Sequence, residues 1–130
     1  MELLFKCQID GRCYIKKNQK RIFGRGKRKV IVYTPEFRQW ESRALSVILI
    51  QKKIFGIYEP IDYFVHAKYT FSFENHLSEA DLSNLFEGPS DLLEKSGVIK
   101  NDKLIHSYDG SRKLFGQRSG LLVELFKFIE

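Results

Sequence analysis

Two sets of acidic residues, separated by one helical pattern, are the part of the chain best suited to chemistry. The first set is Glu79 with Asp81, and the second is Asp102. An acid at the start of a helix and an acid at the entrance to the next strand can converge on one point. Hard divalent cations such as Mg²⁺ bind oxygen ligands of this kind. This spacing predicts a metal site.

The segment between the acids has helical periodicity. Its apolar residues share one face: Leu82, Leu85, Phe86, Leu92 and Leu93. Its polar residues share the opposite face: Asp81, Asn84, Glu87 and Asp91. Gly97 suits the end of this helix. Gly88-Pro89 interrupts the pattern, so either the helix kinks there or a short turn over 81–87 precedes a helix that begins at Pro89.

Each acid also has a purely structural interpretation. Asp81 at a helix N-terminus is typical of a capping residue, and Ser78-x-x-Asp81 resembles a capping box. Asp102 before a strand is typical of a turn residue. The spacing alone leaves the metal site and these interpretations open.

A strongly basic stretch near the N-terminus is the second candidate site. The chain has 130 residues and a net charge of +6, and the stretch from Gly11 to Pro35 contains no acid. Its basic residues are Arg12, Lys16, Lys17, Lys20, Arg21, Arg25, Lys27, Arg28 and Lys29. A segment with many cations and no acids indicates a polyanionic partner such as nucleic acid. The alternative is a solvated surface loop.

The composition predicts one globular domain over residues 1–130. Hydrophobic residues make up 43% of the chain, which is enough for a core. No apolar run is long enough for a membrane span, and the N-terminus does not resemble a secretory signal, so we expect a cytoplasmic protein. Cys7 and Cys13 are too few for a structural zinc site and are expected to be reduced and structural.

The order of the expected strands and helices predicts a mixed sheet with two main helices, which is an α/β or α+β fold. Thr34-Pro35-Glu36 is a strong helix start, and this helix should run to about Lys53. The expected strands cover 2–9, 30–33, 61–73, 104–108 and 121–129. The expected loops include the basic stretch 14–29 and the segment 111–120.

These residues resemble the RusA family of Holliday-junction resolvases. Lys16-Lys17-Asn18-x-Lys20-Arg21 is similar to the basic loop of that family, and Pro35 to Leu45 is similar to its first helix. The most specific likeness is Asp81-Leu82-Ser83-Asn84-Leu85, followed by Asp91-x-Leu93, Gly97 and Asn101-Asp102. The later run Asp109-Gly110-Ser111-Arg112-Lys113 is also similar.

The resemblance implies a homodimeric, Mg²⁺-dependent endonuclease that cuts four-way branched DNA by paired nicks, in DNA recombination and repair. The resemblance also implies that Mn²⁺ can replace Mg²⁺ as the cofactor. Asp81 and Asp102 fall on metal-binding catalytic acids. Ser83 stands where the family usually has a second catalytic aspartate, and Glu87 stands where its best-known members carry a catalytic lysine. Ser83 and Glu79 are therefore expected as further metal ligands, and Glu87 as a further catalytic residue.

The residues expected to bind DNA lie in the basic stretch and after the second acid. They are Lys16, Lys17, Asn18, Lys20, Arg21, Arg25, Lys27, Arg28, Lys29, Arg112 and Lys113. Because one carboxylate of the pattern is missing, a catalytically weakened or inactive nucleic-acid-binding protein on the same fold is the alternative function. A basic structural or interaction protein is a third.

Overall fold

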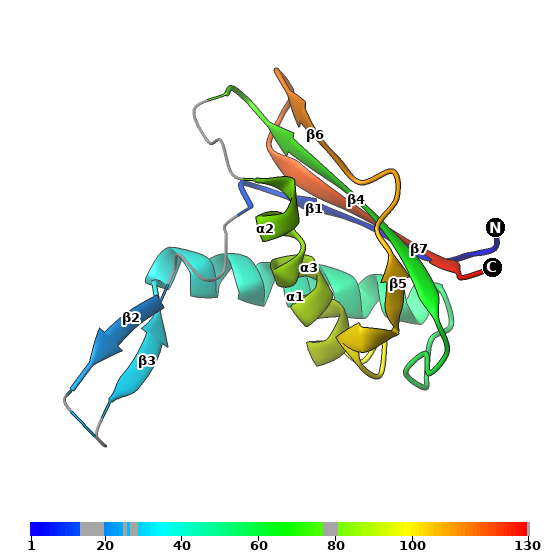
Figure 1. Ribbon diagram of the computed structural model, residues 1–130, viewed down its shortest axis with the longest axis horizontal. Coiled ribbons are helices and arrows are strands. Elements are labelled where there is room, and N and C mark those ends of the chain that lie inside the picture. Colours follow the sequence, from blue (N-terminus) through cyan, green and yellow to red (C-terminus); the bar gives the residue numbers. More distant parts are fainter. Residues whose placement is uncertain (14–19, 25, 27–28, 77–80, 130) are drawn as a thin grey trace.

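The computed structural model describes residues 1–13, 20–24, 26, 29–76 and 81–129 (Figure 1). Its elements are β1 (Leu3–Asp10), β2 (Lys20–Phe23), β3 (Val30–Tyr33), α1 (Pro35–Ile54), β4 (Val65–Phe73), α2 (Leu82–Leu85), α3 (Glu87–Lys95), the 3-10 turn η3 (Asp102–Leu104), β5 (Ile105–Ser107), β6 (Arg112–Phe115) and β7 (Gly120–Lys127). Five strands form one mixed sheet, and β2 and β3 form a separate hairpin. The predicted single-domain α+β fold with a mixed sheet and two main helices is confirmed.

The sheet is built around β4 and β7. Strand β7 lies between β1 and β4 and is antiparallel to both. The other edge of β4 pairs in parallel with β5 near Val65 and with β6 from Thr70 to Phe73. Alternate side chains of the long strands face the core, as the pleat of a strand requires. They are Phe5, Cys7, Ile9, Val65, Ala67, Tyr69, Phe71, Phe73, Leu121, Val123 and Leu125.

Helix α1 begins and ends where the sequence predicts, within one residue. The hydroxyl of Thr34 accepts a hydrogen bond from the Phe37 amide at 3.3 Å, and Pro35 occupies the first turn. These are the features of a capped helix start. One face of the helix buries Phe37, Trp40, Ala44 and Ile48 against the core. The opposite face is open to solvent.

The second predicted helix is divided in two at Phe86. The short helix α2 ends at Leu85, and α3 begins at Glu87. This is close to the second of the two alternatives, with the helix starting two residues before Pro89. Pro89 then lies in the first turn of α3, where its missing N–H is not needed by the helix.

Gly97 ends α3 as predicted. Its φ of +76° is the left-handed conformation that glycine adopts without strain. Its amide donates to the Glu94 carbonyl at 3.1 Å, and the Val98 amide donates to the Leu93 carbonyl at 3.0 Å. This pair of bonds is a Schellman motif. It turns the chain back along α3 toward Asp102.

Three of the predicted boundaries are wrong. The segment 111–120 was expected to be a loop, but it contains β6, which fills the open edge of β4. The basic stretch 14–29 was expected to be a loop, but its central residues, Lys20–Phe23, form β2, which pairs with β3. Strand β4 begins at Val65 rather than Ile61, which makes only an isolated bridge with Ile99. Pairing between segments distant in the sequence decides the first of these, and local propensity does not report it.

Both cysteines are buried and unpaired, as predicted. Burial raises the pKa of the Cys7 thiol to about 11 and that of the Cys13 thiol to about 12. No helix in the described part of the chain is long and apolar enough to cross a membrane.

We expect the free energy of unfolding to fall as the pH rises above the ordinary thiol range. Well below the ordinary thiol pKa of 9.0, both thiols are protonated in the folded and the unfolded chain, so they do not change the free energy of unfolding. Above it, only the unfolded chain ionises them, and at pH 10.5 this costs about 2 kcal/mol for Cys13. Urea unfolding at pH 8 and pH 10.5 tests this. The loss between the two pH values should shrink in Cys13→Ala, and an equal loss in both proteins would contradict it.

Candidate functional site

Asp81 lies immediately before α2, at the N-cap position. Its backbone carbonyl accepts a hydrogen bond from the Asn84 amide at 3.0 Å. Its side chain makes no capping hydrogen bond and is exposed. A side-chain cap is the ordinary structural role for aspartate at this position. Because the carboxylate of Asp81 does not have that role, it is available to a ligand.

Asp102 is the first residue of η3, and the side chains of neighbouring residues make the hydrogen bonds that hold this turn. Asn101 is the N-cap, and its side-chain oxygen accepts a hydrogen bond from the Lys103 amide at 2.9 Å. The Asp102 amide donates to Oε1 of Glu94 at 3.1 Å, which ties η3 to the C-terminal half of α3. The exposed carboxylate of Asp102 takes no part in either bond. Its backbone is held in place while its side chain is available to a ligand.

Buried hydroxyls and stacked rings connect the acidic helix segment with the chain after Asp102. Oγ of Ser90 lies 2.9 Å from the Tyr69 hydroxyl and 3.1 Å from the Tyr108 hydroxyl. The ring of Phe86 stacks on that of Tyr108, with centroids 4.3 Å apart and planes 11° apart. The junction of α2 and α3 is therefore packed directly against the connection from β5 to β6.

The negative charge of Asp102 is felt at this buried cluster. Burial raises the pKa of Tyr69 far above its ordinary value. The hydrogen bond between Tyr69 and Ser90 opposes this rise, and the charges of Tyr108 and Asp102 add to it. The Tyr69 hydroxyl, bonded to Ser90, supports α3 from the sheet.

Two further predicted residues, Ser83 and Glu87, lie along the same helical segment. Ser83 is exposed in α2, and Glu87 is exposed at the first position of α3. Glu79 lies outside the described residues. Within the described part of the chain, no three His, Cys, Asp or Glu side chains are grouped to hold a metal ion. Mg²⁺ commonly takes one or two protein carboxylates and completes its shell with water and substrate phosphate. Asp81 and Asp102 fit that donor set.

Comparison with known proteins bears on this arrangement. No family profile matches the chain. Over 94 residues it is 31% identical to a protein of Aquifex aeolicus (strain VF5) described as crossover junction endodeoxyribonuclease RusA, and the match covers 72% of this chain and 71% of that protein. The chain belongs to the RusA family. The roles of Asp81, Asp102, Ser83 and Glu87 stay predictions within that family.

The basic stretch of this RusA-family chain is carried partly by the β2–β3 hairpin. Lys20 and Arg21 begin β2, and Lys29 is exposed just before β3. Other predicted DNA-binding residues of this stretch lie outside the described residues: Lys16, Lys17, Asn18, Arg25, Lys27 and Arg28. Figure 1 shows the hairpin projecting from the N-terminal end of α1, away from the sheet.

Arg112 and Lys113 do not lie in a loop, as expected, but on strand β6. Neighbouring residues of a strand point to opposite faces of the sheet. Nζ of Lys113 lies 5.8 Å from the centre of the Phe115 ring, whereas Arg112 is exposed. The two side chains therefore leave β6 on opposite faces of the sheet, and their DNA-binding role stays a prediction.

Sequence reasoning missed two supports of the site and one basic surface. The contacts of Glu94 with Asp102 and of Ser90 with Tyr69 have no local sequence signal, because they join separate elements. The surface is the open face of α1, which carries Arg38 and Arg43 with Gln39 and Ser42. The same helical spacing that predicts the buried face of α1 would have revealed it.

Proposed function

We propose that this RusA-family protein is a Mg²⁺-dependent DNA endonuclease that cuts four-way junctions by paired nicks. The observation that carries the proposal is the state of the two acids. Asp81 is an N-cap residue whose side chain makes no capping hydrogen bond, and beside Asp102 the side chain of Asn101 caps the turn. Both carboxylates remain exposed. Together with the relative described as a crossover junction endodeoxyribonuclease, this supports a metal-binding role.

The residues of the chain divide the work of phosphodiester hydrolysis among them. A bound Mg²⁺ supplies Lewis-acid polarisation of the phosphate and activation of water. Asp81 and Asp102 would hold it, with Ser83 and Glu79 as further oxygen donors. Glu94 and Asn101 keep the Asp102 backbone in place. Lysines and arginines of the basic stretch neutralise charge on the phosphate.

A homodimer fits this function, because paired nicks in a twofold junction need two active sites related by a twofold axis. Exposed aliphatic side chains at the C-terminal end of α1, those of Leu49, Ile50 and Ile54, offer a second copy an apolar surface. Sedimentation equilibrium of the purified protein tests the dimer. A monomer at all concentrations that support cleavage would contradict it.

A catalytically weakened DNA-binding protein is the second candidate. Ser83 in place of an acidic residue and the lack of a three-acid group among the described residues favour it. Incubating a synthetic four-way junction and a linear duplex with the protein, with and without Mg²⁺, separates the two functions. The nuclease nicks the junction only with the metal, whereas the binding protein retains junction affinity and leaves the DNA intact.

The basic stretch should dominate the salt dependence of DNA binding. Each phosphate contact contributes about −0.9 to the slope of log K against log salt on duplex DNA. Replacing Lys16, Lys17, Lys20 and Arg21 with alanine should therefore flatten the slope by up to about 3.6. Fluorescence anisotropy across a NaCl series measures the slope. The matched control replaces Lys6, Lys53, Lys100 and Lys127, and an equal change in both variants would show that the stretch is only a solvated surface.

A further inference from the structure

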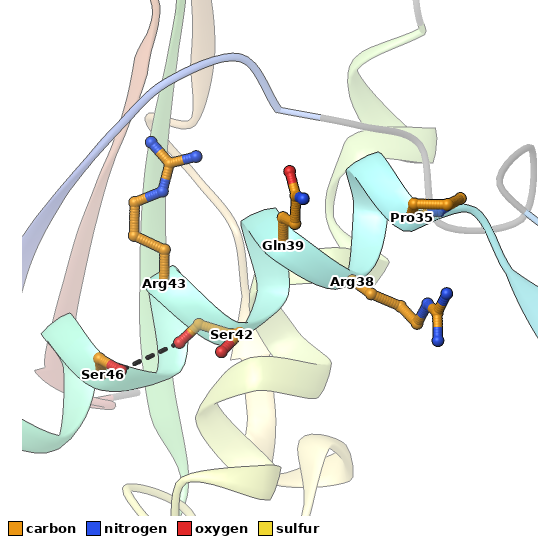
Figure 2. Close-up of a pocket in the computed structure, with 6 residues that line it drawn as sticks. All are labelled: Pro35, Arg38, Gln39, Ser42, Arg43 and Ser46. Carbon is orange, nitrogen blue, oxygen red and sulfur yellow. Dashed lines mark hydrogen bonds between the residues drawn. The ribbon is translucent and has the colours of Figure 1, made fainter.

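The open face of α1 is a hollow lined mainly by polar side chains. Its lining residues are Pro35, Arg38, Gln39, Ser42, Arg43 and Ser46 (Figure 2). Neither an acidic side chain nor an aromatic ring is among them. Arg38 and Arg43 lie five residues apart, which is about 7.5 Å along the helix axis. In Figure 2 they extend to opposite sides of α1, with Gln39 and Ser42 between them.

Arg43 joins this hollow to a second one at the end of β1. The second hollow is lined by Asp10, Gly11, Arg12, Arg43, Glu74, Arg118 and Ser119. Nη1 of Arg43 would lie 3.6 Å from a Cβ added at Gly11, so its guanidinium reaches over that turn. The second hollow also carries the exposed acids Asp10 and Glu74 and a further exposed arginine, Arg12. Arg38, Arg43 and Arg118, all exposed, extend from the start of α1 to the turn before β7. With Gln39 and Ser42 we call them the arginine face.

The arginine face continues the basic hairpin without a break in the chain. Strand β3 ends at Tyr33, and α1 begins at Pro35. Figure 1 shows the hairpin leaving the N-terminal end of α1, so the face and the hairpin share that end of the helix. The arginine face therefore begins at the point where the hairpin joins α1.

The chemistry of the arginine face fits a phosphate backbone better than a protein. Arginine, serine and glutamine side chains are the usual contacts to phosphate oxygens, and such contacts carry no sequence information. Protein interfaces centre on buried apolar and aromatic side chains, and the arginine face has none. We infer that the arginine face binds the phosphate backbone of a duplex arm of the DNA substrate. This inference rests on the proposed function and adds a second DNA-binding surface to it.

The salt dependence of DNA binding tests the inference. The variant Arg38→Ala/Arg43→Ala should flatten the slope of log K against log NaCl by about 1.8, the value for two phosphate contacts. Arg38→Lys/Arg43→Lys should keep most of the slope, because the charges remain. The control Lys6→Ala/Lys53→Ala removes two exposed cations outside both hollows and should leave it unchanged. All proteins are titrated into a labelled four-way junction in EDTA, so that cleavage does not interfere.

Thiol labelling is a second test of the inference, and it does not depend on the arginine variants. Ser42→Cys places an exposed thiol on the face, while Cys7 and Cys13 are buried. Junction DNA should slow the reaction of this thiol with a maleimide at least about tenfold, and should not slow the reaction at Lys53→Cys. Equal rates with and without DNA at Ser42→Cys would overturn the inference.

The outcomes separate this inference from the proposed function. If the wild type binds and nicks the junction but the alanine pair keeps the wild-type slope, the arginine face is refuted and the nuclease stands. If the wild type binds no DNA, both are refuted. If the wild type binds without nicking and the slope falls as expected, the arginine face stands and the nuclease is refuted.

Discussion

Asp81→Asn and Asp102→Asn should each lower the rate of junction cleavage on the order of a thousandfold, because each removes a charged ligand worth several kcal/mol to the transition state. Junction affinity should stay the same or rise, since one negative charge near the phosphates is lost. Both side chains are exposed, so neither change should unfold the protein. Single-turnover cleavage and anisotropy on the same junction measure the two effects.

Asp109→Asn is the matched control for these variants. Asp109 is an exposed aspartate in the turn between β5 and β6, and it lies close in sequence to Asp102. Its replacement removes the same charge without touching either proposed ligand. Cleavage by Asp109→Asn should be close to that of the wild type. Normal cleavage by Asp81→Asn or Asp102→Asn would refute the metal site.

Glu87→Gln should lower cleavage about a hundredfold if Glu87 compensates for Ser83. Glu87 is the first residue of α3, directly after the break at Phe86, and its side chain is exposed. A long acidic side chain at this position can reach back along the polar face toward α2. In that case Ser83→Asp should restore much of the activity lost in Glu87→Gln. The assay is Mg²⁺-dependent nicking of the junction, with Glu59→Gln, an exposed glutamate outside the site, as control.

The opposite hypothesis makes a different prediction for the same residue. If Glu87 only occupies a position where a lysine would help, its charge repels DNA, and Glu87→Lys should exceed the wild type. A gain in Glu87→Lys therefore rejects compensation. A loss in both Glu87→Gln and Glu87→Lys rejects repulsion. We favour compensation, because Ser83 removes a carboxylate from the same segment.

Local sequence signals predicted the helix ends that depend only on neighbouring residues. Thr34 and Pro35 start α1, and Gly97 ends α3, because capping depends on a few neighbouring residues. The sequence also placed Leu85, Leu92 and Leu93 on the buried side of the helical segment. These features needed no knowledge of the rest of the fold.

Contacts between distant segments could not be predicted in the same way. Strand β6 forms because β4 has an open edge beside it, and its own residues Arg112 to Phe115 have weak strand character. The supports of the candidate site have the same origin. Ser90 meets Tyr69 and Tyr108 across three elements, and Glu94 meets Asp102 across the turn after α3. Such contacts follow from the fold as a whole. The sequence therefore indicated Asp81 and Asp102 as candidate ligands, but it did not indicate the contacts that support them.

Cleavage of a synthetic four-way junction, titrated with Mg²⁺, is the most direct measurement of the central claim. The wild type should nick two opposing strands at symmetric positions, with Mn²⁺ able to replace Mg²⁺ and with no product in EDTA. Asp81→Asn, tested beside it, should bind the junction and leave it intact. Tight junction binding by the wild type without nicking at any Mg²⁺ or Mn²⁺ concentration would contradict the claim, as would equal cleavage of linear duplex.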